Sequence, residues 1–250
     1  MCILFFSLNM RARLFLIVGL ISSALLWLFL LIRFAPVSEE IRSALRFPSS
    51  FHDLRELADT LNLVQKENLS YLLVLFSSAY LFKQAFAVPG SVFMNVLAGA
   101  VFGIGVGFPL CSLLTGSGAT CCYLLARLCG RDAVVHYFPE RVESFKTKLK
   151  ANKDSLAYFL LALRLLPVSP NWAINICCGV LNVPMSTFFW TATVGLMPYN
   201  FVCIQAGALL SDIKSMDDVY NASTLLKLSL VAVLALVPAL IKSRKSRVVQ

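Results

Sequence analysis

Two stretches decide how this chain folds: KQAFAVPGS (residues 83–91) and RLLPVSPN (residues 164–171). The first follows the short apolar segment 69–82, and the second contains the end of the short apolar segment 156–166. Fourteen residues extend only about 21 Å as a helix, less than the ~30 Å of a bilayer core. Short, proline-broken segments at comparable places in two halves are typical of re-entrant hairpins with a site between them. The sequence predicts an all-α polytopic membrane protein, an inverted repeat of two re-entrant helical hairpins plus spanning helices.

The composition also requires a membrane. Of the 250 residues, 58% are hydrophobic and 14% charged, and the mean hydropathy is +0.78. A soluble domain has about 45–50% apolar and about 25% charged residues. The chain has too little charged surface for a soluble enzyme.

The basic residues and the cysteines exclude other classes of protein. The net charge is +9, but the Lys and Arg residues flank apolar runs, which is a membrane-orientation signal. We therefore expect no nucleic-acid partner. The eight cysteines contain no C-x-x-C pair and only two histidines accompany them, so the cysteines are interpreted as packing residues. No metal site and no cofactor is expected.

The apolar runs divide the chain into segments. We expect an N-terminal tail with the first transmembrane helix at 1–33. A lumenal polar segment at 34–68 should hold a short helix, either along the interface or packed on the domain. The core, 69–210, is predicted to contain hairpin 69–100, span 104–128, basic loop 130–154, hairpin 155–183 and span 186–210. A last transmembrane helix at 225–241 and a basic cytosolic tail at 242–250 complete the chain.

The charges of the loops orient these segments. The basic loop 130–154 and the tail 242–250 should be cytosolic, whereas the acidic loop 211–224 should be lumenal. Both termini are then cytosolic, and the two halves have opposite orientations. A model with six full spans instead places the basic loop in the lumen. The basic loop either lies on an anionic leaflet or forms a solvated helix. The acidic loop contains a glycosylation sequon at Asn221, close to the next span, and its modification is not expected.

Arg164 is the sharpest candidate for a functional residue. A charge within the membrane costs about 2.5–3.5 kcal/mol on insertion scales, so it usually faces a cavity or a partner. Its guanidinium either contacts lipid phosphate or caps carbonyls freed by the broken helix. Lys83 either attracts headgroups or snorkels to the interface.

The other candidates are amides, prolines and glycines. The polar residues at depth either line a hydrophilic groove or form interhelical hydrogen bonds. Helix-breaking residues at this depth require a hydrated or protein-lined interior. The candidates for a lipid path are Lys83, Gln84, Pro89, Gly90, Arg164, Pro167, Pro170, Asn171, Asn175 and Asn200, with Gln205 as a further amide. The small-x-x-x-small series Gly99, Gly103 and Gly107 predicts close helix packing, with dimerisation as the alternative.

Carboxylates are missing from the apolar core. No Asp or Glu lies between Glu67 and Asp132, or between Asp154 and Asp212. Cation-coupled transporters commonly have such carboxylates, and a hydrolase needs an acid–base or nucleophile–base set. The sequence therefore predicts no enzyme and no catalytic residue.

Five motifs resemble the VTT family, also called DedA or SNARE-associated Golgi proteins. They are YLFKQAFAVPGS (80–91), the glycine stretch 99–107, the Arg164–Trp172 stretch, NICCGVLNVP (175–184) and GLMPYNF (195–201). The similarity covers residues 45–243 and is greatest to the animal transmembrane protein 41 group, in particular its A-type branch. The resemblance implies paired re-entrant hairpins and an endoplasmic-reticulum phospholipid scramblase tied to autophagy. Bacterial members carry an acidic residue near the first hairpin and a second arginine after the Arg-x-x-Pro. Both are missing here, so proton coupling is not implied.

Passive, ATP-independent phospholipid scrambling is the leading hypothesis. Headgroups would move along a polar groove between the two hairpins, and membrane phospholipids would be the main partners. The alternatives are a membrane scaffold that recruits trafficking or autophagy partners, and a small-solute transporter. A second copy of the chain and other VTT proteins are further candidate partners.

Overall fold

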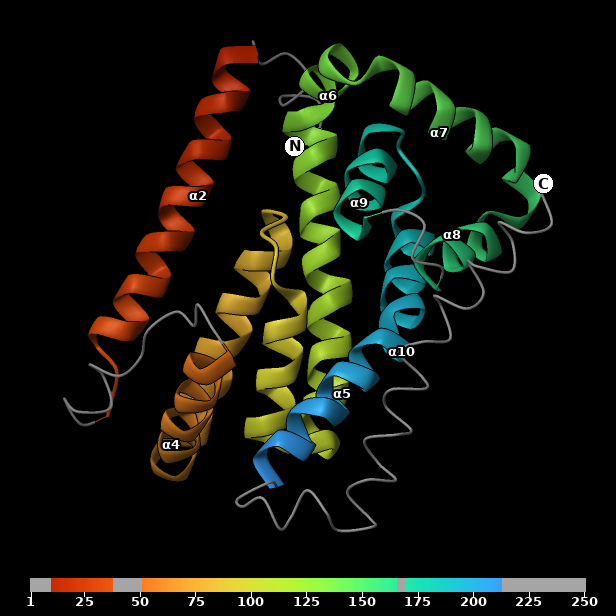
Figure 1. Cartoon of the computed structure of the whole chain (residues 1–250). Coiled ribbons are helices and arrows are strands. Elements are labelled where there is room, and N and C mark those ends of the chain that lie inside the picture. Colours follow the sequence, from red (N-terminus) through yellow and green to blue (C-terminus); the bar gives the residue numbers. More distant parts are fainter. Residues whose placement is uncertain (1–9, 38–50, 166–169, 213–250) are drawn as a thin grey trace.

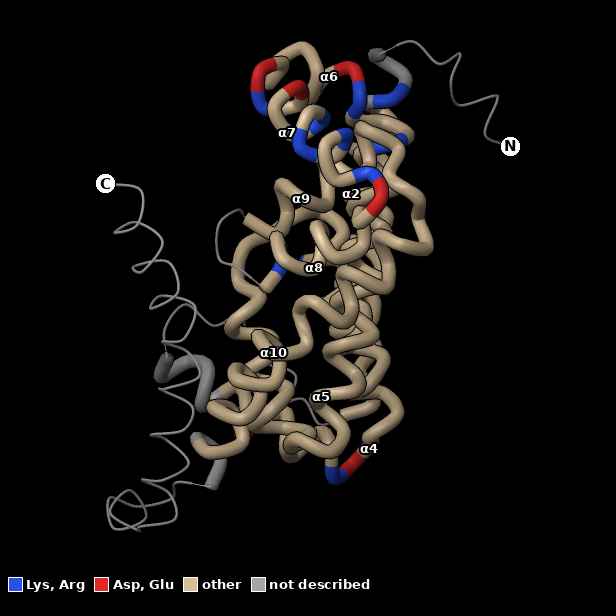
Figure 2. The backbone as a smooth tube through the Cα atoms, turned by 90° about the vertical axis from the view of Figure 1, so that its right-hand side faces the viewer, with Lys and Arg blue, Asp and Glu red and all other residues tan. Residues whose placement is uncertain are grey.

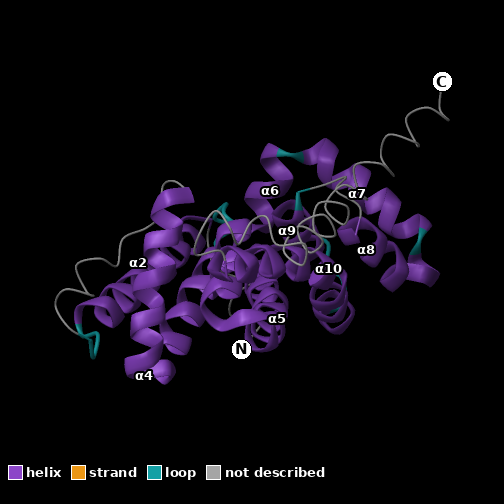
Figure 3. Ribbon diagram, turned by 60° about the horizontal axis from the view of Figure 1, so that its bottom comes forward, coloured by secondary structure: helices purple, strands orange, loops and turns teal. Residues whose placement is uncertain are grey.

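The computed structural model describes residues 10–37, 51–165 and 170–212, and every regular element among them is helical (Figure 3). Three helical segments are long and apolar enough to cross a membrane: Phe15–Arg33, Ser91–Tyr137 and Met185–Leu209. The all-α prediction is confirmed for these residues, and the chain is a helical membrane protein. Pro167, Asn221, the predicted span 225–241 and the tail 242–250 lie outside the described residues.

Figure 1 shows the described helices. In chain order they are α2 (Met10–Arg33), α4 (Phe51–Ala85), α5 (Ser91–Leu125), the π-helix η1 (Ala126–Gly130), α6 (Arg131–Tyr137), α7 (Pro139–Ala151), the 3-10 helix η2 (Lys153–Ser155), α8 (Leu156–Leu165), α9 (Asn171–Val180) and α10 (Met185–Asp212).

Helix α4 consists of two arms that meet at Asn68. This residue leaves the helical conformation (φ −153°, ψ 84°), and its Oδ1 accepts a hydrogen bond from the Tyr71 N–H at 3.0 Å. Asn68 is thus the N-cap of the second arm. The first arm buries Ala58, Leu61 and Val64 in the protein core. The helix predicted within 34–68 therefore packs on the domain rather than lying free along the interface.

A Schellman motif ends α4 and turns the chain at residues 86–90. The Val88 N–H donates to the Lys83 carbonyl at 2.9 Å, and Ala87 takes a left-handed φ of 55°. Gly90, with φ 112°, then precedes the first turn of α5. Pro89 has no N–H for a continuing helix. The proline-broken stretch of the sequence is therefore a helix stop followed directly by a new helix.

Helix α5 also has two arms, and Gly103 separates them. Its φ of 67° with ψ −178° belongs to a region that is essentially restricted to glycine. The first arm (91–102) folds back on the second (104–125). The close approach of the two arms is seen at Gly107, where a Cβ would lie 3.0 Å from the Ala98 carbonyl oxygen. Figure 1 shows the turn 86–90 beside the middle of the second arm. Gln84 contacts this arm at Gly118, where a Cβ would lie 2.5 Å from the Gln84 Cβ.

Helices α8 and α9 are short, with ten residues each. Ten residues extend about 15 Å, half of a bilayer core. Helix α9 ends with the same motif as α4: the Val183 N–H donates to the Cys178 carbonyl at 3.0 Å, and Asn182 has a φ of 54°.

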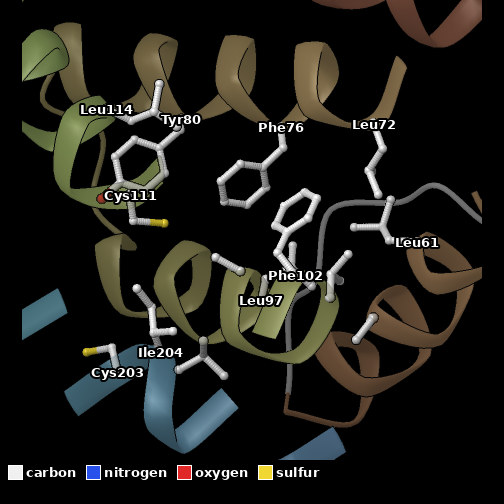
Figure 4. Packing of buried hydrophobic residues seen from close by; sticks show 14 of the residues in the cluster. Leu61, Leu72, Phe76, Tyr80, Leu97, Phe102, Cys111, Leu114, Cys203 and Ile204 are labelled. Atoms are coloured by element: carbon white, nitrogen blue, oxygen red, sulfur yellow. The ribbon is translucent and has the colours of Figure 1, made fainter. Parts of the chain in front are cut away.

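Apolar side chains form a core between α4, α5 and α10 (Figure 4). In this cluster the Phe76 ring lies edge-on to Phe102, with their centroids 5.2 Å apart. A second cluster joins α5, α8, α9 and α10, where the rings of Tyr123 and Phe188 stack at 4.8 Å. The apolar side of α7 packs inward, since Val142 is buried and Phe145 contacts the second cluster. These contacts attach α7 to the protein core, and the two interpretations of the basic loop, a position on an anionic leaflet and a solvated helix, stay predictions.

Glycines allow α5 and α10 to approach closely. A Cβ at Gly99 would collide with the backbone of Ile204, and one at Gly207 would collide with Val96. Gly99 and Gly107 thus lie at close contacts, as the glycine series predicts. Gly103 has nothing within 4 Å of where its Cβ would be. Its role is conformational rather than packing, because only its φ and ψ require glycine.

Candidate functional site

Arg164 is buried at the end of α8 and faces the start of α9. Its relative exposure is 8%. The guanidinium donates through one terminal nitrogen to Asn171 Oδ1 at 2.5 Å and through the other to Asn175 Oδ1 at 3.2 Å. It also lies over the Phe188 ring, 4.9 Å from the centroid. The sequence predicted Arg164, Asn171 and Asn175 separately, and the fold brings them together as one group, which we call the arginine cluster.

The arginine cluster has a donor without an acceptor. The Arg164 Nε is buried and has no hydrogen-bond partner among the described residues. Both partners of the terminal nitrogens are neutral amides, and no Asp or Glu occurs between Asp154 and Asp212. A buried donor left unpaired costs about 1–3 kcal/mol, and more when it is charged. The arginine cluster is therefore suited to an anionic acceptor such as a phosphate oxygen, which guanidinium groups bind through two N–H donors.

Lys83 is also buried, with 6% relative exposure. Its Nζ donates to Ser91 Oγ and to Gln84 Oε1, the latter at 3.3 Å, and it lies 5.5 Å from the centroid of the Tyr80 ring. The snorkelling interpretation is wrong, because these contacts hold the ammonium inside the protein. Ser91 was not among the predicted site residues.

Four buried side chains form a closed ring of hydrogen bonds, which we call the polar ring. Tyr80 Oη donates to Asn95 Oδ1 (2.9 Å), Asn95 Nδ2 to Asn200 Oδ1 (2.9 Å), and Asn200 Nδ2 to Thr115 Oγ1 (3.1 Å). Because the Tyr80 proton is used by Asn95, the 2.8 Å contact between Tyr80 and Thr115 must have Thr115 as its donor. All four side chains are at most 3% exposed.

The polar ring changes the interpretation of Asn200. This residue was predicted to line the lipid path, but it bonds to Asn95 and Thr115 of α5, as the interhelical alternative for the amides predicts. Asn95 and Thr115 were missed. In the sequence, each of them is a polar residue inside an otherwise apolar run. That pattern alone does not distinguish them from other Asn, Ser or Thr residues within the apolar segments.

The two buried cations lie at neighbouring levels of the molecule. On the second arm of α5, Gly118 contacts Gln84, the neighbour of Lys83, and Gly116 contacts Thr193 of α10. Arg164 contacts Gly195, two residues after Thr193 on α10.

A separation of two residues, as between Gly116 and Gly118 or between Thr193 and Gly195, corresponds to about 3 Å of helix rise. Lys83 adjoins Gln84, so both cations approach the middle of the span formed by α5. Pro89 and Pro170 flank these groups and are exposed.

Figure 2 shows most of the charged residues outside the interior at the end of the molecule that holds α6 and α7, and a smaller group at the opposite end, on α4. The first turns of α2 lie at the end with α6 and the basic helix α7. Arg13 of α2 forms an ion pair of 2.6 Å with Asp132 of α6. The N-terminal end of α2 and the basic loop therefore lie on the same side.

These features define a helical membrane protein with two buried cationic side chains near the middle of α5. The sequence profile of the VTT domain family matches residues 88–209. The transmembrane protein 41 homolog of Caenorhabditis elegans is 34% identical over 211 residues, which are 84% of this chain and 86% of that protein. The homolog of Dictyostelium discoideum is 33% identical over 213 residues, 85% of this chain, and the match spans 64% of that relative, a little under two thirds. Transmembrane protein 41B of Homo sapiens is 31% identical over 235 residues, 94% of this chain and 81% of the relative.

The chain therefore belongs to the VTT domain family and is similar to transmembrane protein 41. No solved structure matches it. The A-type branch stays a prediction.

Proposed function

We propose that this chain is a passive, ATP-independent phospholipid scramblase. In this proposal the headgroup crosses the interior past Lys83 and Arg164 while the acyl chains stay in the bilayer. The observation that carries it is Arg164, a buried cation near the middle of α5: its Nε lacks a partner among the described residues, in a core without carboxylates.

The proposed path needs the two hairpins to be re-entrant. The turn 86–90 beside the middle of α5, and the ten-residue lengths of α8 and α9, support this arrangement. The ion pair between Arg13 and Asp132 puts the N-terminal end of α2 on the side of the basic loop, which supports a cytosolic position for both. The inverted repeat and a cytosolic C-terminus belong to the proposal through the charge pattern of the sequence and the family resemblance. The endoplasmic reticulum and autophagy-type membrane growth belong to the proposal through the family resemblance.

The energetic argument concerns the headgroup phosphate. An anion at mid-depth loses its hydration, which costs several kcal/mol even after relaxation. Two cations without acidic partners compensate part of this cost, and the Asn171 and Asn175 amides hold the guanidinium in place. No covalent step and no coupling ion is needed.

Reconstitution into liposomes tests the proposal. Vesicles that contain a fluorescent phospholipid are treated with dithionite, which bleaches only the outer leaflet. If the protein scrambles lipids, the fraction of fluorescence that is bleached exceeds the fraction of the fluorescent lipid in the outer leaflet. Arg164→Gln should slow this phase about 10- to 100-fold, which corresponds to ~1.5–3 kcal/mol for a hydrogen bond to a charged group.

The matched control is Arg131→Gln, which removes an exposed arginine of α6 and should leave the rate unchanged. If wild-type protein bleaches only the outer leaflet, scrambling is refuted for the isolated chain. If Arg164→Gln folds and scrambles at the wild-type rate, Arg164 is a structural residue and the proposed path is wrong.

A further inference from the structure

A lateral pocket lies between α2, α4 and α5, and the proposed function does not use it. Its volume is about 270 Å³. No charged side chain lines it, and Ser78 is its hydroxyl-bearing residue. The lining residues are Ala24, Trp27, Leu28, Ser78, Leu81, Phe82, Ala85, Phe86 and Cys121.

The pocket is on the opposite face of α4 from the buried polar groups. Ser78, Leu81, Phe82 and Ala85 follow the i, i+3, i+4, i+7 spacing of one helix face. Tyr80 and Lys83 lie between them in sequence and point into the interior, where they make the contacts described above. The pocket is therefore separate from the proposed headgroup path.

Helix α2 lies at the side of the other described helices, and polar contacts along its length join it to α4 and α6. None of its apolar span is buried, and Figure 1 shows it set apart from α4 and α5. Arg13 pairs with Asp132 near one end, and the Tyr71 hydroxyl donates to the Leu31 carbonyl at 2.9 Å near the other. Between them, Trp27 Nε1 donates to Ser78 Oγ at 3.1 Å. The pocket is the space that these contacts leave open.

The position, polarity and size of the pocket indicate which kind of molecule can bind in it. Ala24 is the middle residue of the span Phe15–Arg33, so the surrounding solvent is hydrocarbon. Ser78 Oγ accepts from Trp27 Nε1, and the one hydroxyl in this lining does not supply the two to four polar partners that hold a water. The volume exceeds the roughly 150 Å³ of an apolar cavity that binds benzene. It is smaller than one turn of helix, which occupies ~400 Å³ at a 5.4 Å pitch and ~10 Å diameter.

We propose that the α2–α4–α5 pocket is a binding site for one acyl chain of a bilayer phospholipid. The chain fills the space between α2 and the core and joins them by dispersion contacts, independently of whether headgroups are moved. The bound lipid is thus a structural ligand that fixes α2 against α4.

Photo-crosslinking with a defined lipid tests this site. The full-length protein is reconstituted in phosphatidylcholine vesicles that contain phosphatidylcholine with a diazirine on one acyl chain, and adducts are mapped by mass spectrometry. We expect the adducts to gather at Ala24, Trp27 and Leu28 of α2 and at Cys121 of α5. Ala24→Phe fills the pocket and should reduce these adducts at least fivefold.

The control Leu25→Phe adds a ring on the exposed side of α2 and should leave the adducts unchanged. Adducts spread evenly over exposed apolar residues such as Phe15 and Val18 would mean bulk lipid contact and would overturn the proposal. An absence of adducts at the pocket, with adducts elsewhere on α2, would show that something other than lipid fills it and would equally overturn it. Both outcomes are read on the wild-type chain, so the test does not depend on the folding of a variant.

Discussion

The polar ring and the arginine cluster are both buried among apolar helices, but they differ in whether each buried donor atom has a partner among the described residues. In the polar ring, Tyr80, Asn95, Asn200 and Thr115 each donate to the next member, and the circuit closes. In the arginine cluster, two amides accept from Arg164, while its Nε has no partner among the described residues. Groups that satisfy one another specify a structure, whereas a buried donor atom without a partner has capacity for a ligand.

The elements that each cluster joins make the same distinction. The polar ring ties α4, both arms of α5 and α10, so it fixes the first hairpin against two long helices. The arginine cluster joins only the short helices α8 and α9 and rests on Phe188 of α10. We therefore assign a structural role to the polar ring and reserve the ligand role for the arginine cluster.

The largest expected effect is the loss of stability in Asn95→Leu. This change removes two bonds of the polar ring, and interhelical hydrogen bonds in membranes contribute ~0.6 kcal/mol on average and up to ~1.7. The free energy of unfolding in an SDS titration of mixed micelles should fall by about 1–3 kcal/mol. Lipid movement per folded molecule should stay within about twofold of wild type.

Ser112→Ala is the matched control for Asn95→Leu. The Ser112 hydroxyl is buried on α5 but has no partner among the described residues, so its removal should cost nothing. If the Asn95→Leu variant is no less stable than the Ser112→Ala variant, the polar ring does not stabilise the fold. If it folds normally but stops lipid movement, the division between the two clusters fails.

The second-largest expected loss of stability concerns Gly103. The break of α5 at this residue allows its two arms to bring Asn95 and Thr115 into the same polar ring. Gly103→Ala forces a Cβ into a left-handed φ and should cost about 1–2 kcal/mol in the same titration. Gly105→Ala is the control, because Gly105 has open space and no left-handed φ. It should be neutral or stabilising by up to ~1 kcal/mol. Equal effects of the two substitutions would contradict a conformational role for Gly103.

The sequence predicted the arginine cluster better than the polar ring, for a physical reason. Arg164, Asn171 and Asn175 lie within twelve residues of one another, and a charge within an apolar run is a strong local signal. Asn95 and Asn200 are 105 residues apart, and no local periodicity encodes their contact. The same holds for Gly103: a small-x-x-x-small series predicts packing, whereas its positive φ follows from the fold-back of the two arms.

The helical class and the family were predictable because they rest on composition and on contiguous motifs. The surroundings of Asn200 and Lys83 were not predictable. Asn200 was predicted to line a path, with interhelical hydrogen bonding as the alternative, and it belongs to the polar ring. Lys83 was predicted either to attract headgroups or to snorkel, and it is held inside by Ser91 and Gln84. Each depends on which way a helix turns its polar residue, and in a nearly uniform apolar sequence the hydrophobic pattern does not fix that rotation.

The third effect is the coupling within the polar ring. Tyr80 and Asn200 share Asn95 and Thr115 as partners but do not bond to each other. In a double-mutant cycle of Tyr80→Phe and Asn200→Leu, we expect a coupling free energy of at least ~0.5 kcal/mol, since members of one network are not additive. Additive losses in the SDS titration would mean four independent bonds rather than one closed circuit.

The smallest expected effect is the coupling between the two clusters. Tyr80→Phe and Asn171→Ala act on groups that share no hydrogen-bond partner, so their stability losses should add within ~0.3–0.5 kcal/mol. Only Asn171→Ala should slow lipid movement, by about threefold, because it removes one of the two amides that orient Arg164. A coupling as large as that within the polar ring would make the two clusters a single network. The Arg164 Nε, which has no partner among the described residues, would then be part of this structural network, and the assignment of separate roles would be lost.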